Sequence, residues 1–321
     1  MFSPGAYVEP ANPGDASLRP GLMDVKYDPE DITAWRKLQD EVGHDKDPKY
    51  LLSKEFVDRF DAVIVMHIPE WITNNWEAMK HKTVVWRTIG QSIAHQELKL
   101  SHYRDQGMKI VRYSPMERNI PHYCGEDAMI RFYKDPEEFG SWTGEEERVI
   151  NFTQHMKQRN RACNFTLFEQ VTRPFSRGLY GPGNEAAGDF ALGKQPFDEL
   201  KSLMRRSRVY FYTGTHPASY TLNFIEAWMT GIPIVAIGFE HGNAKYFPGH
   251  KLYEIPDLIE NGVTGFISDN AEELQGYIST LLTDSSVAQI ISTNARTRAI
   301  EVFGIDTIRP QWEAFLNGLQ A

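Results

Sequence analysis

Short apolar runs alternate with amphipathic stretches along most of this chain. Residues 61–67 (DAVIVMH) form a near-continuous apolar run of strand length, which is typical of a parallel strand covered on both faces. Strand patterns also cover 83–88, 109–113, 128–133, 148–153, 175–180, 208–213 and 233–238. Helices are predicted over 29–42, 70–80, 92–106, 162–171, 196–206, 221–230 and from 271 onward. The alternation predicts an α/β fold with parallel sheets.

The alternation is interrupted by residues 134–147 (KDPEEFGSWTGEEE). This stretch is polar, acidic and glycine-containing, which favours a linker between two domains. The length of 321 residues leaves room for about two ordinary domains. We therefore predict two doubly wound units in series, with a cleft between them.

Composition narrows the classes of function. The 34 Lys and Arg against 43 Asp and Glu give a formal charge of −9 without a basic run, which disfavours a nucleic-acid binder. The apolar runs are strand-sized and no leader pattern is visible, so we expect no membrane span and a cytoplasmic location. No HExxH and no cluster of His and Cys occurs at ligand spacing, so no metal site is predicted.

Candidate chemistry lies after the predicted strand 208–213, because open α/β sheets bind ligands beyond the carboxyl ends of their strands. The loop 214–220 (GTHPASY) is rich in small and hydroxyl-bearing residues and leads into a predicted helix. Free backbone N–H groups and the dipole at a helix start favour an anion such as phosphate. An ordinary turn between strand and helix has a similar composition, so both interpretations stay open.

The helix predicted over 221–230 (TLNFIEAWMT) contains a single charged residue, Glu226. A helix that is apolar on nearly every side is buried, and a carboxylate within it needs hydrogen-bond donors. The donors are either a structural partner, such as an arginine or backbone amides, or the vicinal hydroxyls of a ribose. Spacing alone does not decide between them.

Four segments carry a recognisable order of motifs. Residues 226–236 read EAWMTGIPIVA, and residues 255–267 read IPDLIENGVTGFI. Residues 303–312 lead from Phe-Gly-Ile to a Trp, and residues 128–139 end in DPEEF. In this order they resemble the signatures EAMAxGxPVVA, PEIIxDGxxGFLV, FSWxxxxxxW and IPNGVDxxxF of the retaining, GT4-type glycosyltransferases with the GT-B fold.

The resemblance implies two Rossmann-like domains facing a cleft. Residues 1–145 would form an acceptor-binding domain, joined by a C-terminal helix (305–321) that crosses back to it, and residues 146–304 would bind the donor. The implied reaction is a retaining, metal-independent transfer of a sugar from a nucleoside diphosphate, such as UDP or GDP, to a hydroxyl. The acceptor would be a glycan, a lipid-linked or a small-molecule alcohol. The nucleotide sugar is a co-substrate, and no further cofactor is implied.

The resemblance also implies roles for particular residues. The family's glutamate at the position of Glu226 binds the ribose hydroxyls, and the loop before its helix contacts the diphosphate and the sugar. The donor-binding residues implied here are Glu226, Thr215, His216, Ser219, Tyr220 and Thr221, with Gly181 in a turn near the base.

Catalysis would need positive charge on the leaving diphosphate, where negative charge develops. The family supplies it just after the first strand of the second domain, which makes Arg159 and Arg161 the candidates here; a solvated basic helix start is the alternative. In the family a histidine at a strand end reaches the donor sugar, for which His67 is the candidate. The acceptor-binding candidates at other strand ends are Arg87, Gln91 and Glu117.

One departure from the family pattern affects the predicted activity. The family's E-x7-E motif places its first glutamate, which touches the donor sugar, at Ala218. A changed sugar preference, a hydroxyl substitute or a catalytically impaired donor-binding homologue are all consistent with this alanine. Further alternatives are a phosphorylase or an epimerase with the same fold, or a transferase that acts on modified DNA.

Overall fold

The structure of this chain is a computed structural model, and it describes residues 28–42, 51–90, 92–243 and 251–319. The chain divides into two compact units. The first contains the described residues up to Ile89, together with His95–Val111 and Cys124–Ala128. The second contains Gly90–Ala94, Arg112–Tyr123 and the chain from Met129 onward.

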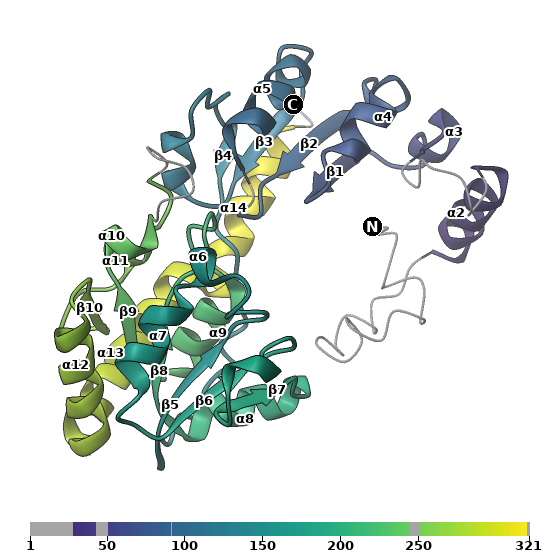
Figure 1. The fold of residues 1–321 in the computed structure, drawn as a ribbon. Coiled ribbons are helices and arrows are strands. Elements are labelled where there is room, and N and C mark those ends of the chain that lie inside the picture. Colours follow the sequence, from purple (N-terminus) through teal and green to yellow (C-terminus); the bar gives the residue numbers. More distant parts are fainter. Residues whose placement is uncertain (1–27, 43–50, 91, 244–250, 320–321) are drawn as a thin grey trace. The chain divides into compact units, whose positions relative to one another are not determined.

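A four-stranded sheet organises the first part of the chain (Figure 1). Its strands follow the order β1-β2-β3-β4, and the pairs β1–β2 and β2–β3 are parallel. The strands are β1 (Ala62–Met66), β2 (Thr83–Arg87), β3 (Lys109–Arg112) and β4 (Ala128–Met129). The accompanying helices are α2 (Pro29–Val42), α3 (Lys54–Val57), α4 (Glu70–Met79) and α5 (Ala94–Arg104). The core of this unit joins Ile72 and Trp76 of α4 to Val84 and Ile110 of the sheet.

The expected coverage of the first strand on both faces is wrong. Ile64 is 45% and Met66 is 53% exposed, whereas Val65 is buried. The reason is that β1 lies at the edge of the sheet, so its apolar residues are not enclosed as those of β2 are. The predicted strand 128–133 is also shortened to β4, which has two residues.

The second unit contains a six-stranded sheet in the order β10-β9-β8-β5-β6-β7 (Figure 1). Counted from β7, its chain order is 3-2-1-4-5-6, the order of a doubly wound dinucleotide-binding sheet. The bounds are β5 (Glu146–Phe152), β6 (Arg177–Tyr180), β7 (Ala191–Gly193), β8 (Ser207–Tyr212), β9 (Ile234–Ile237) and β10 (Phe266–Ser268). All five neighbouring strand pairs in this sheet are parallel, as predicted from the buried apolar runs.

Helices pack in two groups around this sheet. One group pairs α7 (Phe165–Thr172) with α12 (Ala271–Thr283), and the other pairs α9 (Leu222–Thr230) with α8 (Phe197–Arg206) and α13 (Ser285–Phe303). The remaining helical segments are η2 (Pro115–Asn119), α6 (Asn160–Cys163), η3 (Glu185–Ala187), α10 (Phe239–Gly242), α11 (Ile255–Leu258) and α14 (Ile305–Gly318). The core is apolar and nearly continuous, from Val149 and Phe211 in the sheet to Trp228 and Phe303 in the helices.

Two predicted segments differ in detail. The helix expected over 162–171 is divided into α6 and α7, because Asn164 adopts a left-handed backbone with φ of 55°. Residues 134–147 belong to the second unit, where Lys134, Phe139 and Gly140 are buried. The Arg296 guanidinium of α13 donates to the carbonyls of Phe139 and Pro136, which fixes this polar segment on the helices. Within the described residues no helix is long and apolar enough to cross a membrane.

Candidate active site

The order of the six strands singles out one edge of the sheet. Strands β5 and β8 are neighbours, and the chain winds outward from them in opposite directions, so their carboxyl ends form the topological switch point. In doubly wound sheets this is where ligands bind. The two segments that leave it are 153–159, after β5, and 213–221, after β8.

The segment after β8 is held by hydrogen bonds to its own neighbours. The amides of His216, Ala218 and Ser219 donate to the Ala162 carbonyl at 2.8 Å, the Thr215 carbonyl at 2.8 Å and the Tyr113 hydroxyl at 2.7 Å. The expectation of free backbone N–H groups therefore does not hold for these three amides. It is the first turn of α9 that lacks a side-chain cap.

The missing cap has a local cause. Thr221 precedes α9, but its hydroxyl bonds the Tyr212 hydroxyl at 3.1 Å and the Asn223 side chain instead of the helix amides. An uncapped helix start carries partial positive charge and favours an anion. The start of α9, with Thr221 beside it, is thus suited to an anion, and the phosphate site there stays a prediction.

Three of the buried polar atoms without a hydrogen-bond partner among the described residues lie near the ends of β5 and β8. They are Asn151 Oδ1 on β5, Thr213 Oγ1 after β8 and the Tyr253 hydroxyl. The Tyr253 ring stacks on Tyr212, the last residue of β8, with centroids 6.4 Å apart. Buried polar atoms in native proteins nearly always have a partner, including ordered water or a ligand. These three atoms therefore leave hydrogen-bonding capacity at this edge of the sheet that water or a ligand would satisfy.

Glu226 lies one turn into α9 and forms an ion pair with Lys134, in which Nζ donates to Oε1. The Glu226 side chain is 12% exposed and that of Lys134 is 9% exposed. The structural partner left open by the sequence is therefore a lysine. No hydrogen bond within the described parts of the chain engages the second carboxylate oxygen, Oε2.

Several other donor-site candidates surround α6. The His216 amide binds the Ala162 carbonyl of this helix, and the Thr215 side chain hydrogen-bonds the Cys163 thiol. Burial raises the pKa of that thiol, although the nearby charge of Arg159 acts in the opposite direction. Arg159 and Arg161 are exposed at the start and within α6. The charge of Arg159 therefore acts next to the predicted donor loop, and Arg161 lies on the same short helix; their catalytic roles stay predictions.

Gly181 lies at the turn after β6, against the end of β5. Its φ is 118°, and a Cβ there would lie 3.2 Å from the Thr153 carbonyl carbon and oxygen. The neighbouring Asn184 donates to the Thr153 carbonyl at 2.7 Å and accepts from the Met156 amide at 2.8 Å. This close approach requires glycine and joins the turn to the segment after β5.

A second ion pair, between Arg131 and Glu254, is connected to the donor loop by a hydrogen bond. Glu254 accepts from the Arg131 guanidinium and from the Ser114 hydroxyl, the latter at 2.6 Å, and its amide donates to the Ser219 carbonyl at 3.1 Å. Burial by itself lowers the pKa of Arg131, but the bond to Glu254 and its charge outweigh this and raise it. The Tyr220 hydroxyl donates to the Tyr113 carbonyl at 2.7 Å. Ser219 and Tyr220 are thereby fixed from the end of β3.

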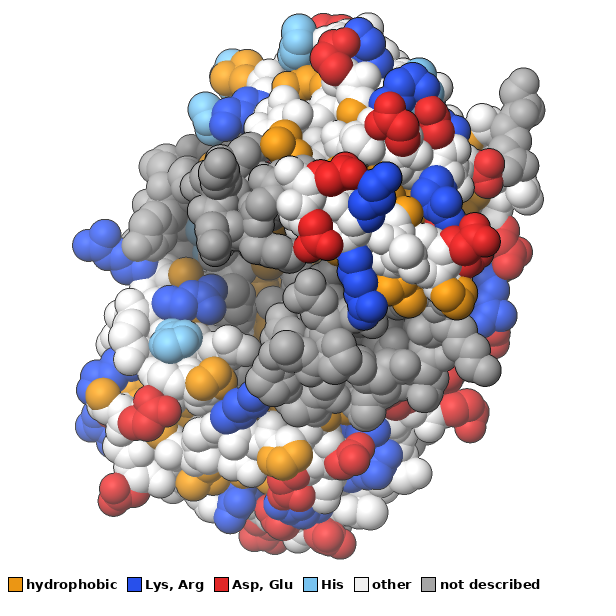
Figure 2. Space-filling model, turned by 90° about the vertical axis from the view of Figure 1, so that its right-hand side faces the viewer, with side chains coloured by type: hydrophobic (Ala, Val, Ile, Leu, Met, Phe, Trp, Pro, Cys, Tyr) orange, Lys and Arg blue, Asp and Glu red, His pale blue; other side chains and the backbone are white. Residues whose placement is uncertain are grey.

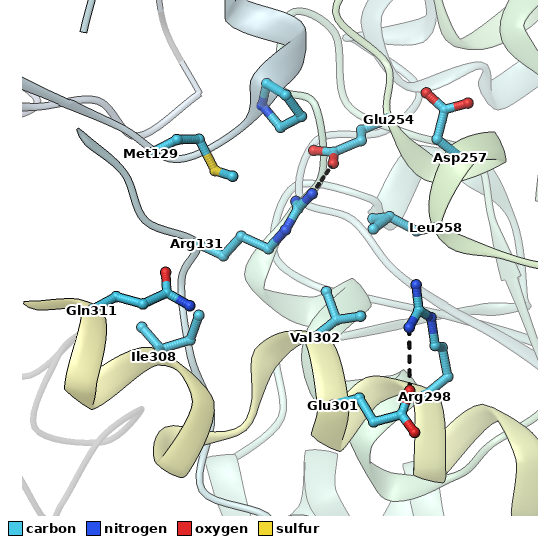
Figure 3. A pocket seen from close by; sticks show the side chains of 11 residues that line it. Met129, Arg131, Glu254, Asp257, Leu258, Arg298, Glu301, Val302, Ile308 and Gln311 are labelled. Atoms are coloured by element: carbon cyan, nitrogen blue, oxygen red, sulfur yellow. Dashed lines mark hydrogen bonds and ion pairs between the residues drawn. The ribbon is translucent and has the colours of Figure 1, made fainter. Parts of the chain in front are cut away.

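Next to this pair the structure has a cavity of about 410 Å³ (Figure 3). Its wall includes the Arg131–Glu254 pair and the exposed Arg298–Glu301 pair of α13, which are drawn as dashed lines in Figure 3. The lining comes from η2, Glu254, α11, α13, α14 and residues 129–131, and not from the segments after β5 and β8. We therefore do not identify this cavity with the strand-end site.

The remaining candidates are dispersed. His67 is exposed after β1 with φ of 69°, and Arg87 is buried at the end of β2; both belong to the first unit. Gln91 lies outside the described residues. Glu117 is buried in the second unit, where Oε2 accepts from the Tyr113 amide at 3.0 Å and Oε1 lies 3.9 Å from Arg112. Their acceptor and catalytic roles stay predictions.

Sequence reasoning missed four residues that shape this site: Lys134, Arg131, Glu254 and Tyr113. Arg131 precedes and Lys134 begins a segment with the composition of a linker, so nothing local marked Lys134 as buried or Arg131 as the partner of a buried acid. Glu254 stands immediately before a motif that was recognised, and its isolation among apolar residues (LYEIP) was the available signal. In the described part of the chain, no three His, Cys, Asp or Glu side chains are placed to hold a metal ion together.

Comparison with known proteins identifies the fold. No protein-family model and no curated protein sequence matches the chain. Among solved structures, HepE of Anabaena in complex with UDP matches with a TM-score of 0.62 and 15% identity, over 83% of this chain and 80% of that one. Sucrose-phosphate synthase of Thermosynechococcus elongatus matches with a TM-score of 0.62 and 13% identity, over 81% and 74%.

A glycosyltransferase of Rickettsia africae matches with a TM-score of 0.61 and 16% identity, over 89% of this chain and 87% of that one. At these identities the likeness concerns the fold. Together with the two parallel sheets, it confirms the GT-B architecture that the motifs predicted.

Proposed function

We propose that this chain is a glycosyltransferase that moves a sugar from a nucleoside diphosphate to a hydroxyl acceptor. The observation that carries the proposal is the coincidence, at the switch point of the donor-type sheet, of the uncapped start of α9, unpartnered buried polar atoms and Glu226. The fold has been solved with this class of ligand: HepE is described in complex with UDP, with UDP and glucose, and with UDP-glucose.

In the proposed arrangement, the start of α9 and Thr215–Thr221 hold the diphosphate, and Glu226 accepts from the ribose hydroxyls. The bond between the anomeric carbon and the diphosphate oxygen breaks while the acceptor oxygen bonds to the same face of that carbon, which gives retention. The acceptor proton passes to the departing phosphate. Arg159, Arg161 and the α9 dipole would stabilise the charge that develops there, so the transfer is proposed to need no metal ion.

Titration calorimetry with UDP and GDP tests donor binding, and release of UDP from UDP-glucose in the presence of simple alcohols and glycans tests transfer. Arg159→Ala should lower turnover more than nucleotide affinity, because its charge matters most in the transition state. Arg173→Ala is the matched control, since this exposed arginine follows α7, away from the predicted donor loop. Equal effects of the two variants would contradict the role of Arg159.

A second candidate, a donor-binding protein without transfer, is favoured by Ala218. The family acid is absent there, and a Cβ on Gly90 would lie 3.2 Å from the Ala218 Cβ, so this position is closely packed. Nucleotide binding without release of UDP from any donor would support this candidate. A modified-DNA acceptor is not favoured, because the chain carries a formal net charge of −9. On the face drawn in Figure 2, the coloured basic and acidic side chains are interspersed.

A further inference from the structure

Lys134 engages one of the two oxygens of Glu226, the residue proposed to bind ribose. The pair is almost enclosed, and the Lys134 ammonium otherwise lies 5.3 Å from the centroid of the Phe139 ring. A buried ammonium depends strongly on its partner, because losing that partner leaves an uncompensated charge. The contact therefore restricts Glu226 to the side-chain conformation that meets Nζ, with Oε1 occupied and Oε2 without a hydrogen bond in the described structure.

Phe303 contacts both Lys134 and the helix that carries Glu226. The Lys134 amide donates to the Phe303 carbonyl at 2.9 Å, and Lys134 forms a bridge with Gly304. The Phe303 ring packs on α9, with centroids 6.4 Å from Phe224 and 6.3 Å from Trp228, on either side of Glu226 in sequence. The amine and the carboxylate are therefore held in register by a fully buried side chain.

We infer that Lys134 is a positioning residue, which holds the Glu226 carboxylate so that Oε2 accepts from a ribose hydroxyl. The inference rests on the proposed function and deepens it: Lys134 makes the site selective for ribonucleotides over deoxyribonucleotides. A preorganised carboxylate loses little conformational entropy when the sugar binds. A charge-assisted hydrogen bond contributes about 1.5–3 kcal/mol, which corresponds to about a 10–150-fold preference for the hydroxyl-bearing ligand.

The test compares the dissociation constants of UDP and 2′-deoxy-UDP for the wild-type chain, Lys134→Met and Lys134→Arg. We expect the wild type to prefer UDP by about tenfold or more, and Lys134→Met to reduce the ratio to about threefold or less. Lys134→Arg retains the ion pair, but its planar guanidinium engages both carboxylate oxygens, so the ratio should also fall while the thermal stability is kept. This second variant keeps the test decisive if Lys134→Met does not fold.

The control is Arg206→Met, which removes a cation that pairs with Glu199 and Glu146 in the same unit. It should leave the UDP to 2′-deoxy-UDP ratio unchanged, whatever its effect on stability. A purely structural Lys134 would alter the unfolding temperature in Lys134→Met without altering the ratio, and that result overturns the inference alone. Failure of the wild type to bind UDP or GDP overturns the proposed function and this inference with it; if only GDP binds, GDP and 2′-deoxy-GDP replace the uridine pair.

Discussion

The two Arg–Glu pairs that line the cavity in Figure 3 should differ sharply in their contribution to stability. Glu254 is 1% exposed, and its carboxylate binds Arg131 and the Ser114 hydroxyl. In contrast, the Arg298 and Glu301 side chains are 47% and 58% exposed, with 3.2 Å between Nη1 and Oε2. The substitution to compare is glutamate to glutamine at each position, because glutamine keeps the size and removes the charge.

Glu254→Gln leaves the Arg131 guanidinium buried without a counter-charge, which typically costs about 3–5 kcal/mol of unfolding free energy. Glutamine still accepts from Ser114, so we expect the lower end, about 3 kcal/mol. For a folding unit of this size that lowers the unfolding temperature by about 6–12 °C. Glu301→Gln removes an exposed pair and should cost about 0.5 kcal/mol or less, because solvent screens the charges.

Scanning calorimetry and urea unfolding of both variants measure these differences. The double-mutant cycle of Glu254→Gln with Arg131→Met then isolates the coupling between the two buried side chains. Losses of similar size at Glu254 and Glu301 would refute the assignment of the buried pair as the support of Ser219 and Tyr220. So would an unperturbed unfolding temperature in Glu254→Gln.

Three further predictions concern glycines and buried hydroxyls. Gly181→Ala should destabilise the chain by about 1–3 kcal/mol and weaken nucleotide binding, because φ is 118° there and Thr153 leaves no room; urea unfolding and calorimetry measure both effects. Gly276→Ala should instead stabilise it by about 0.5–1 kcal/mol, since this glycine lies inside α12 with nothing within 4 Å of the added Cβ; destabilisation in the same urea experiment would contradict this. Burial raises the pKa of four tyrosine hydroxyls above 10.0, so their contribution to stability is complete below pH 10 and is lost as the pH rises through the raised values. The free energy of unfolding should then fall by up to about 5 kcal/mol per pH unit for the four together. Urea midpoints that do not change above pH 10 would contradict this prediction. These residues are Tyr113, Tyr210, Tyr212 and Tyr253.

The alternation of strands and helices was predictable because its causes are local. Parallel strands enclosed in a sheet need uninterrupted apolar runs, and helix starts need a capping oxygen, such as Asp28 for the Glu30 amide at 2.8 Å. Strands β7 and β10, each of three residues, are too short to leave a pattern. The break at Asn164 depends on its bond to the Thr213 carbonyl at 2.9 Å, a contact between segments far apart in sequence.

The candidate site was predictable in part for the same reason. The position of the donor loop follows from the strand that precedes it, and the isolation of Glu226 is visible within ten residues. Its partner is not visible in this way, because Lys134 lies 92 positions away in a segment with a polar composition. The separation of Arg131 from Glu254 is 123 positions. Pairing of charges across such distances is decided by packing, which composition and spacing do not encode.

The polar composition of residues 134–147 also explains how this pairing arises. Burying Phe139 and Gly140 removes backbone carbonyls from water, and these need donors. The Arg296 guanidinium donates to the carbonyls of Phe139 and Pro136, and the Lys134 amide donates to the Phe303 carbonyl. These bonds hold the segment against the helices and place the Lys134 side chain next to Glu226. The sequence offered a structural partner or a ribose as alternative explanations for that acid, but the structure makes them compatible: the lysine uses Oε1, and the proposed ribose contact uses Oε2.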